Sequence, residues 1–295
     1  AASVQLPEDF GTTTPIPFGA EVTVSDGGAL SINGTATMAG NVTGDLVLDL
    51  SSTQNFLSAF DVAVSGLTKN LGATVQASTK LALGDGALSL TDMLAQLGGN
   101  RLSGHLSAQF SDIPYVSGAL NFGTLDLRRS DGVAPKSGDG NGTSTAALTG
   151  WSQDPLDLGA LGLVNADLGV TGDALITDTL RIDGFSGQVR VENARAVFTL
   201  DELNAYRGAG AGEFVLNARN GLSTAIRFQG NAVDLSPLMS DMLDVNSIEG
   251  RANVNLDLLG VGSSVDGIMK SLSGTAGCNV DSGRWTGVDL DSLLR

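Results

Sequence analysis

The chain has 295 residues, of which 42% are hydrophobic, and its formal net charge is −16. This length suffices for one large domain or two smaller ones, and the acidic balance argues against nucleic-acid partners and anionic membrane surfaces. Forty glycines without a Gly-X-Y period, beside only seven prolines, exclude collagen and proline-rich linkers. The glycines are therefore expected in turns and bulges.

Short runs of alternating apolar and polar residues, separated by Gly, Asn and Asp, predict half-buried antiparallel strands. In chain order the clearest runs are Glu21–Val24, Asp45–Leu50, Arg101–Phe110, Thr179–Ile182, Gln188–Glu192, Glu213–Arg219, Thr224–Gln229 and Ala252–Leu258. Turn residues fall between them about every ten residues. The fold is therefore expected to be mainly β.

Helices are expected to be few and short. Apolar spacing and helix-starting residues favour them over Ser52–Phe60, Ser236–Leu243 and Ser264–Leu272, with a further cap near Leu290. Leu90 to Leu97 also fits helical spacing. Its alternating flank and the following Gly-Gly-Asn turn favour a bulged strand.

The segment between Arg128 and Gly150 has no apolar period and is rich in Gly, Ser, Thr and Asp. It is predicted to be a flexible linker or long loop. This divides the chain into an upstream β region (1–128), the linker (129–150) and a second β region (151–295). No run approaches the ~20 apolar residues of a membrane-spanning helix, so we expect a processed or excised soluble region.

Candidate catalytic and metal-binding residues are scarce. Cys278 and His105 are the only cysteine and histidine, which excludes an intrachain disulfide and thiolate or multi-histidine metal sites. Neither a serine-hydrolase elbow nor a P-loop signature occurs. We expect Cys278 in the core and His105 as a satisfied strand residue. Asp139–Thr143 resembles the start of a calcium loop, but Gly150 stands where the closing carboxylate is needed. No catalytic residue, cofactor or metal is expected.

The second half of the chain resembles the C-terminal region of the AsmA family. Seven segments follow the family pattern in order: Pro155–Leu158, Asn165–Leu168, Phe214–Arg219, Asn231–Leu238, Ile248–Leu258, Gly262–Gly274 and Asp281–Leu290. The resemblance covers Trp151 to Arg295, and the stretch ending at Leu120–Leu127 looks like the upstream AsmA-type region. A counterpart of the family's N-terminal membrane helix is missing.

The resemblance implies a non-enzymatic protein of the bacterial envelope, anchored in the inner membrane with its bulk in the periplasm. It also implies a long antiparallel sheet curled into an open half-pipe with an apolar groove, as in bridge-like lipid-transfer relatives such as TamB. Its partners would be phospholipid acyl chains and envelope proteins, and its role would be phospholipid traffic and outer-membrane biogenesis.

The residues themselves agree with an open apolar face, because few helices are expected to cover the sheet. The alternative is a closed β-sandwich. Aromatic residues make up only 5% of the chain, which suits a smooth surface for acyl chains better than a pocket that stacks a ring.

Two other functions stay open. One is a structural or adhesive extracellular β-array, and the other is a hydrolase built on a carboxylate pair among 26 Asp and 6 Glu. Period-two alternation selects the lipid-groove candidates, which are Leu180, Ile182, Val189, Val191, Phe214 and Leu216. Arg190 and Asn217 serve as their controls.

Overall fold

The computed structural model describes residues 2–4, 11, 13–62, 72–128, 153, 156, 159–177, 180–219, 221–243 and 245–285. Strands dominate. They are β1 (Ala2–Val4), β2 (Ile16–Val24), β3 (Gly28–Ala36), β4 (Val42–Leu50), β5 (Val75–Gly84), β6 (Ala87–Leu97), β7 (Asn100–Gln109), β8 (Tyr115–Asp126), β9 (Asn165–Ile176), β10 (Arg181–Ile182), β11 (Gly184–Glu192), β12 (Arg195–Ala205), β13 (Gly208–Asn217), β14 (Ser223–Asp234), β15 (Ile248–Val261) and β16 (Ser273–Trp285).

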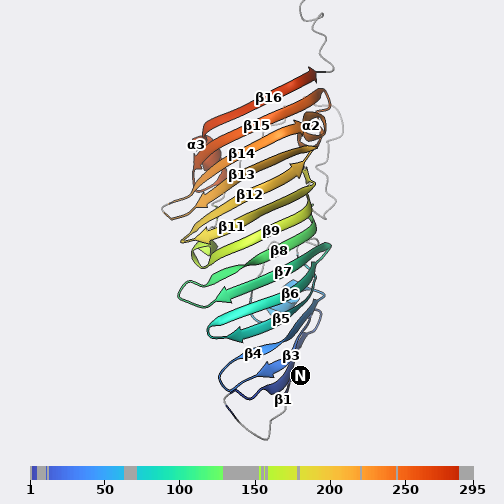
Figure 1. Ribbon diagram of the computed structural model, residues 1–295, viewed down its shortest axis with the longest axis vertical. Helices are drawn as coiled ribbons and strands as arrows, with labels where there is room; N and C mark the ends of the chain where they lie inside the picture. The colour runs from blue at the N-terminus through green and yellow to red at the C-terminus, as the bar shows by residue number, and fades with distance from the viewer. Residues whose placement is uncertain are drawn as a thin grey trace, which may run out of the picture.

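These strands form one long sheet that follows the chain from β1 to β16 (Figure 1), with β10 paired to β9 off the main path. Every neighbouring pair is antiparallel except β8 and β9, which run parallel. Hairpins explain the antiparallel pairs, whereas a parallel pair needs a crossover connection. The chain between Asp126 and Asn165 therefore returns from one end of the strands to the other.

The sheet is curled and open, and it does not close into a barrel or a sandwich. Its two edges are β1 and β16. Only twelve hydrophobic residues among those described are buried, far fewer than two packed sheets would bury. The closed β-sandwich alternative is therefore wrong, and the mainly β, open curled sheet is confirmed.

Turns and helices lie along the two rims of the sheet, where strands end. The α2 rim carries α1 (Thr53–Ser58) and α2 (Leu235–Leu243), and the α3 rim carries the short helix η1 (Gly159–Gly162) and α3 (Val265–Ser271). In Figure 1 these rims are the right and left margins. The Ser52 hydroxyl accepts a hydrogen bond from the Asn55 N–H (3.2 Å), and Ser264 caps α3 through the Gly267 N–H (3.1 Å).

The strand register sorts side chains onto two faces, because residues paired across antiparallel or parallel strands project to the same side. We call the side that carries Leu48 of β4 the apolar face and the side that carries Asp49 the polar face. Glycines on the apolar face let the strands bend toward it. A Cβ at Gly34 would overlap the Thr43 carbonyl oxygen, and one at Gly118 would overlap that of His105.

Two small cores anchor the apolar face at opposite rims. Phe56 of α1 packs on Leu50 and Val75 at the α2 rim. At the α3 rim Leu161 of η1 packs on a cluster of Ala166, Val191 and Ala196. Each helix thus covers the end of the face rather than its middle.

Most expected elements are confirmed. The helices over residues 53–58, 235–243 and 265–271 match the three expected ones, and every expected strand is present, although the one over Thr179–Ile182 is reduced to β10. Residues Ala87–Leu97 form a strand, and a bulge between Leu90 and Met93 explains their helix-like spacing. The expected linker (129–150), the Asp139–Thr143 motif and the cap near Leu290 lie outside the described residues.

One expectation about single residues is wrong. Cys278 is exposed and lies on the edge strand β16, not in a core. No strand covers its outer side among the described residues, so alternation alone could not reveal its exposure. His105 lies on β7 as expected and points to the polar face, opposite Ala119.

Candidate apolar lipid-binding face

One continuous row of apolar residues crosses all fifteen strands of the main path in register. It runs through Val4, Phe18, Gly34, Gly44, Leu81, Leu90, Leu106, Gly118, Leu168, Val189, Phe198, Phe214, Ile226, Leu258 and Gly274. No member has a polar side chain. Because neighbouring strands are ~4.8 Å apart, the row extends over about 65 Å.

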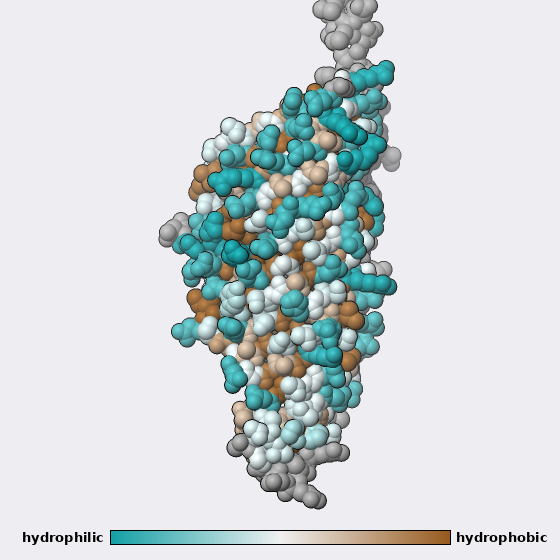
Figure 2. Space-filling view, in the orientation of Figure 1, coloured by the Kyte–Doolittle hydropathy of each residue, from teal (hydrophilic) through white to brown (hydrophobic). Residues whose placement is uncertain are grey.

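The adjacent row on the polar face has a different composition. Its central members include Ser107, Ser117, Asp167 and Arg190, and Arg190 makes an ion pair with Asp167 at 3.0 Å. Figure 2 shows hydrophilic side chains interspersed with hydrophobic ones on the face in view. Beyond Arg190 this row becomes apolar, with Val197, Val215, Ala225 and Leu259 on β12 to β15. The two rows therefore differ most clearly over the central strands.

Charged residues are almost absent from the apolar face. Among described residues with a paired register position, those on this face are Asp126, the last residue of β8, and Arg181, the first of β10. The Arg128 guanidinium lowers the pKa of the Asp126 carboxyl by hydrogen bonding to it. Both charges stand at the α2 rim, so the interior of the apolar face is uncharged.

The middle of the apolar face remains accessible. Leu120, Leu168 and Val170 are half-buried, and the Phe198 side chain is 37% exposed. Side chains of a closed core would be nearly inaccessible. The face can therefore offer hydrocarbon surface to a ligand.

Aromatic rings lie over glycines in the second half of this face. The Phe228 ring occupies the space that a Cβ of Gly210 would fill, and the Phe185 ring does the same at Gly172. Phe198 and Phe214 stand side by side, with ring centroids 5.9 Å apart. The glycines thus leave room for aromatic rings on this face.

Four of the six residues expected to share a face do so. Val189, Val191, Phe214 and Leu216 all lie on the apolar face. Val191, however, is 9% exposed and packs in the η1 core, which Leu216 also contacts. Val189 also packs against this core, so Phe214 is the best placed of the four for ligand contact.

The other two candidates are positioned differently. Ile182 pairs with Leu175, and this register puts it on the polar face, opposite in orientation to Val189. Leu180 lies in the turn before β10, where its N–H donates to the Thr177 hydroxyl (2.9 Å). The alternating pattern does not show how β10 pairs with β9 at the α2 rim, and this pairing decides the orientation of Ile182.

The residues at the centre of the face were not among the lipid-groove candidates. Leu106, Leu168, Phe198 and Ile226 belong to the same row as Val189. Their alternation was visible in the sequence, but the cross-strand register that joins them was not. Counting residues outward from each hairpin turn would have identified the cross-strand partners within that hairpin.

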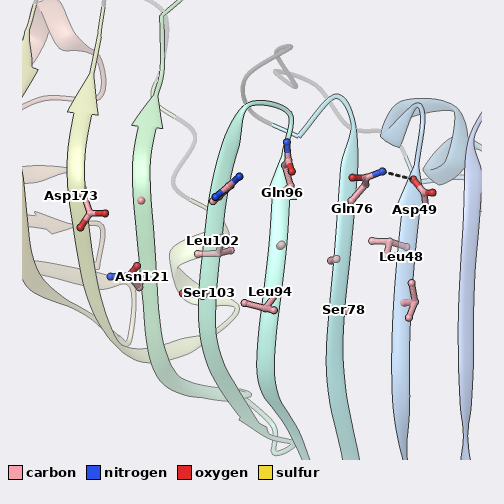
Figure 3. Close-up of a pocket in the computed structure, with 15 residues that line it drawn as sticks. Leu48, Asp49, Gln76, Ser78, Leu94, Gln96, Leu102, Ser103, Asn121 and Asp173 are labelled. Atoms are coloured by element: carbon pink, nitrogen blue, oxygen red, sulfur yellow. Dashed lines mark hydrogen bonds between the residues drawn. The ribbon is translucent and has the colours of Figure 1, made fainter.

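The polar face has a broad hollow of about 710 Å³ over β4 to β9 (Figure 3). Its wall includes Gln76, which donates to Asp49 (3.3 Å), together with Asn121, Asp173 and the exposed Leu94. Asp49 and Asp173 stand five strand spacings apart, about 24 Å along the sheet. That is too far for the paired carboxylates of a glycosidase, which need about 5–9.5 Å.

The described part of the chain contains no cluster of three or more His, Cys, Asp or Glu side chains that could hold a metal ion. No helix there is long and apolar enough to span a bilayer.

A tyrosine fixes α2 to the α2 rim. The Tyr206 hydroxyl donates to Asp241 of α2 (3.0 Å) and accepts the Arg181 N–H (3.2 Å). Burial is the main cause that raises the pKa of Tyr206, and the Asp241 carboxylate adds to it, whereas the Arg181 N–H opposes it. The helix at the end of the face is thus held by a buried, neutral phenol.

Comparison with known proteins gives one match. The sequence model of the AsmA family matches residues 126–295, more than half of the chain. The chain belongs to the AsmA family. This is a family of the bacterial envelope, generally linked to lipid transport and outer-membrane assembly.

The match begins at the last residue of β8, so it includes β9 and all later strands. Neither the curated proteins nor the solved structures contain a significant match. The AsmA assignment thus rests on the family pattern.

Proposed function

We propose that this protein is a periplasmic lipid-binding and lipid-transport module, and that its apolar face holds phospholipid acyl chains without covalent chemistry. The observation that carries the proposal is the row of fifteen apolar residues in register. A hydrocarbon chain laid along this row would meet apolar side chains or glycine at every strand. AsmA membership supports the same role.

The energetics favour broad lipid specificity. Each methylene removed from water contributes about 0.8 kcal/mol, so a contact of several methylenes retains a lipid without a dedicated headgroup pocket. The face has no charged group in its interior that would need pairing with a headgroup. Headgroups would then project past the rims into water.

Membership of the AsmA family supports a proposal for the location in the cell. We propose a periplasmic protein whose full-length form is anchored in the inner membrane and takes part in phospholipid traffic and outer-membrane biogenesis. Envelope proteins are the expected protein partners. The acidic surface, with a net charge of −16, would keep the sheet soluble and would oppose its self-association.

The test is site-specific photo-crosslinking with a matched pair of positions. Phe198 and Thr199 are neighbours on β12, both are exposed, and they project to opposite faces. A photoreactive side chain at Phe198 should capture phospholipid in cells, whereas one at Thr199 should capture little. Val191 is a poor site because it is buried.

The main rival is a structural or adhesive β-array. Equal capture at Phe198 and Thr199, or none at either, would reject lipid binding by the apolar face and favour this rival. Mass spectrometry of the lipid extracted from the purified protein provides an independent measurement.

A further inference from the structure

Exposed hydrophobic side chains are distributed unevenly between the two rims. Among the described residues, ten of the eighteen large hydrophobics that are exposed lie at the α3 rim, against two, Phe60 and Val62, at the α2 rim. The ten are Met38, Leu83, Phe110, Ile113, Tyr115, Leu156, Leu163, Val261, Met269 and Leu272. We call this set the hydrophobic rim.

The most exposed members stand at the tips of separate turns. Met38 (64% exposed) lies between β3 and β4, Phe110 (56%) between β7 and β8, and Leu163 (72%) just before β9. The turns around Met38 and Leu163 carry no charged residue. Figure 2 shows hydrophobic groups breaking the surface along its left margin, on the side of α3.

The members are spread along the sheet rather than gathered in a patch. From the β3–β4 turn to α3 at the end of β15 there are eleven strand spacings, about 53 Å. A protein partner concentrates its binding energy in a compact central cluster of residues. A line of single side chains at turn tips fits an extended apolar boundary instead.

We propose that the α3 rim docks on a lipid bilayer, with the hydrophobic rim inserted at the boundary between headgroups and acyl chains. Aromatic and aliphatic tips such as Phe110, Tyr115 and Leu163 are the side chains favoured at that depth. The net charge of −16 opposes an anionic surface, so the preferred bilayer has zwitterionic headgroups. This inference goes beyond the proposed function, because a sheet could hold lipids without docking sideways on a membrane.

The rim also provides a short route to the apolar face. Leu83, near the end of β5, belongs both to the hydrophobic rim and to the apolar face, where it pairs with Leu88. Within the described residues, the helices of the α3 rim, η1 and α3, stand at β11–β12 and β15. The rim between β4 and β8 therefore leads directly from the docked surface to the row of apolar residues.

The experiment is flotation of the purified protein with vesicles made of equal parts phosphatidylcholine and phosphatidylethanolamine. The variant Met38→Ser/Phe110→Ser/Leu163→Ser should lower the partition coefficient about tenfold or more. The matched control, Phe60→Ser/Val62→Ser at the α2 rim, should bind like the parent. All five side chains are exposed, and circular dichroism verifies that the variants are folded.

A second measurement reports insertion directly. In a Cys278→Ser background, an environment-sensitive dye attached after Phe110→Cys should shift to shorter wavelength when vesicles are added, and the same dye after Phe60→Cys should not. Equal vesicle binding by the triple variant and the parent, equal loss in the control, or equal dye shifts at the two rims would overturn the proposal. Stronger binding to anionic vesicles would overturn the preference for zwitterionic headgroups.

Failure of docking is distinguishable from failure of the proposed function. Lipid capture at Phe198 depends on the apolar face, and flotation depends on the hydrophobic rim. If the triple variant still carries co-purified phospholipid but no longer floats, both proposals hold. If the parent carries lipid but does not float, docking alone is rejected.

Discussion

The side chain of Asn100 pairs with the backbone of Asp126 in both directions. Its carbonyl oxygen accepts the Asp126 N–H at 2.7 Å, and its amide donates to the Asp126 carbonyl at 3.2 Å. Asn100 is only 1% exposed, so an amide side chain here takes the place of a strand partner at the end of β8. It explains how a polar residue is tolerated on the apolar face.

Asn100→Ala should therefore lower the free energy of unfolding by about 2 kcal/mol, because a buried N–H and a carbonyl lose their partner. Denaturant unfolding measures this change. Asn121→Ala is the control: Asn121 donates to Thr171 (2.8 Å) on the exposed polar face, and its loss should cost less than about 0.5 kcal/mol. Equal effects at the two positions would contradict the backbone-pairing role.

The raised pKa of Tyr206 predicts that the protein loses stability at alkaline pH. Burial raises this pKa in the folded state above the usual value of about 10. At a pH between the pKa of the unfolded state and that of the folded state, the folded protein therefore binds more protons than the unfolded chain. Stability should be fully present below about pH 10 and should fall as the pH rises further.

Tyr206→Phe tests this dependence. The variant should be less stable at neutral pH by about 1 kcal/mol, because the hydrogen bond to Asp241 is lost. Its unfolding midpoint should also fall less between about pH 9 and about pH 11. An unchanged alkaline slope would show that other groups govern it.

Gly212 and Ala211 provide a matched pair on β13. A Cβ at Gly212 would overlap the Arg227 carbonyl oxygen, whereas Ala211 is exposed on the polar face. Gly212→Val should lower the free energy of unfolding by about 1–3 kcal/mol, and Ala211→Val should change it by less than about 0.5 kcal/mol. Thermal unfolding distinguishes the two, and a neutral Gly212→Val would contradict the close approach of β13 and β14.

Cys278 reports on the end of the apolar face. It is exposed and pairs with Val254 on that face, so a maleimide should react with the folded protein without prior unfolding. If acyl chains extend to β16, phospholipid loading should slow this reaction several-fold. An unchanged rate in lipid-loaded protein would limit the ligand to earlier strands.

The strands were predictable because their cause is local. The alternation in Asp45–Leu50 or Ala252–Leu258 is a two-residue period within one segment. Ser52 and Ser264 indicate helix starts, because their hydroxyl oxygens can accept hydrogen bonds from the free N–H groups of the first turn. The family could also be inferred, because its pattern consists of such local segments in order. For the candidate site, the sequence determined only which residues of one strand share a face, such as Val189 and Val191.

Only the tertiary structure decided which residues of different strands share a face. The bulge between Leu90 and Met93 sends Leu94 to the polar face, where it is 62% exposed, and the β9–β10 register turns Ile182 away from Val189. Burial could not be predicted from the sequence either. The short helix η1 covers Val191, whereas no described residue covers Cys278. Register and covering depend on contacts between segments distant in the chain, and no period within one segment records those contacts.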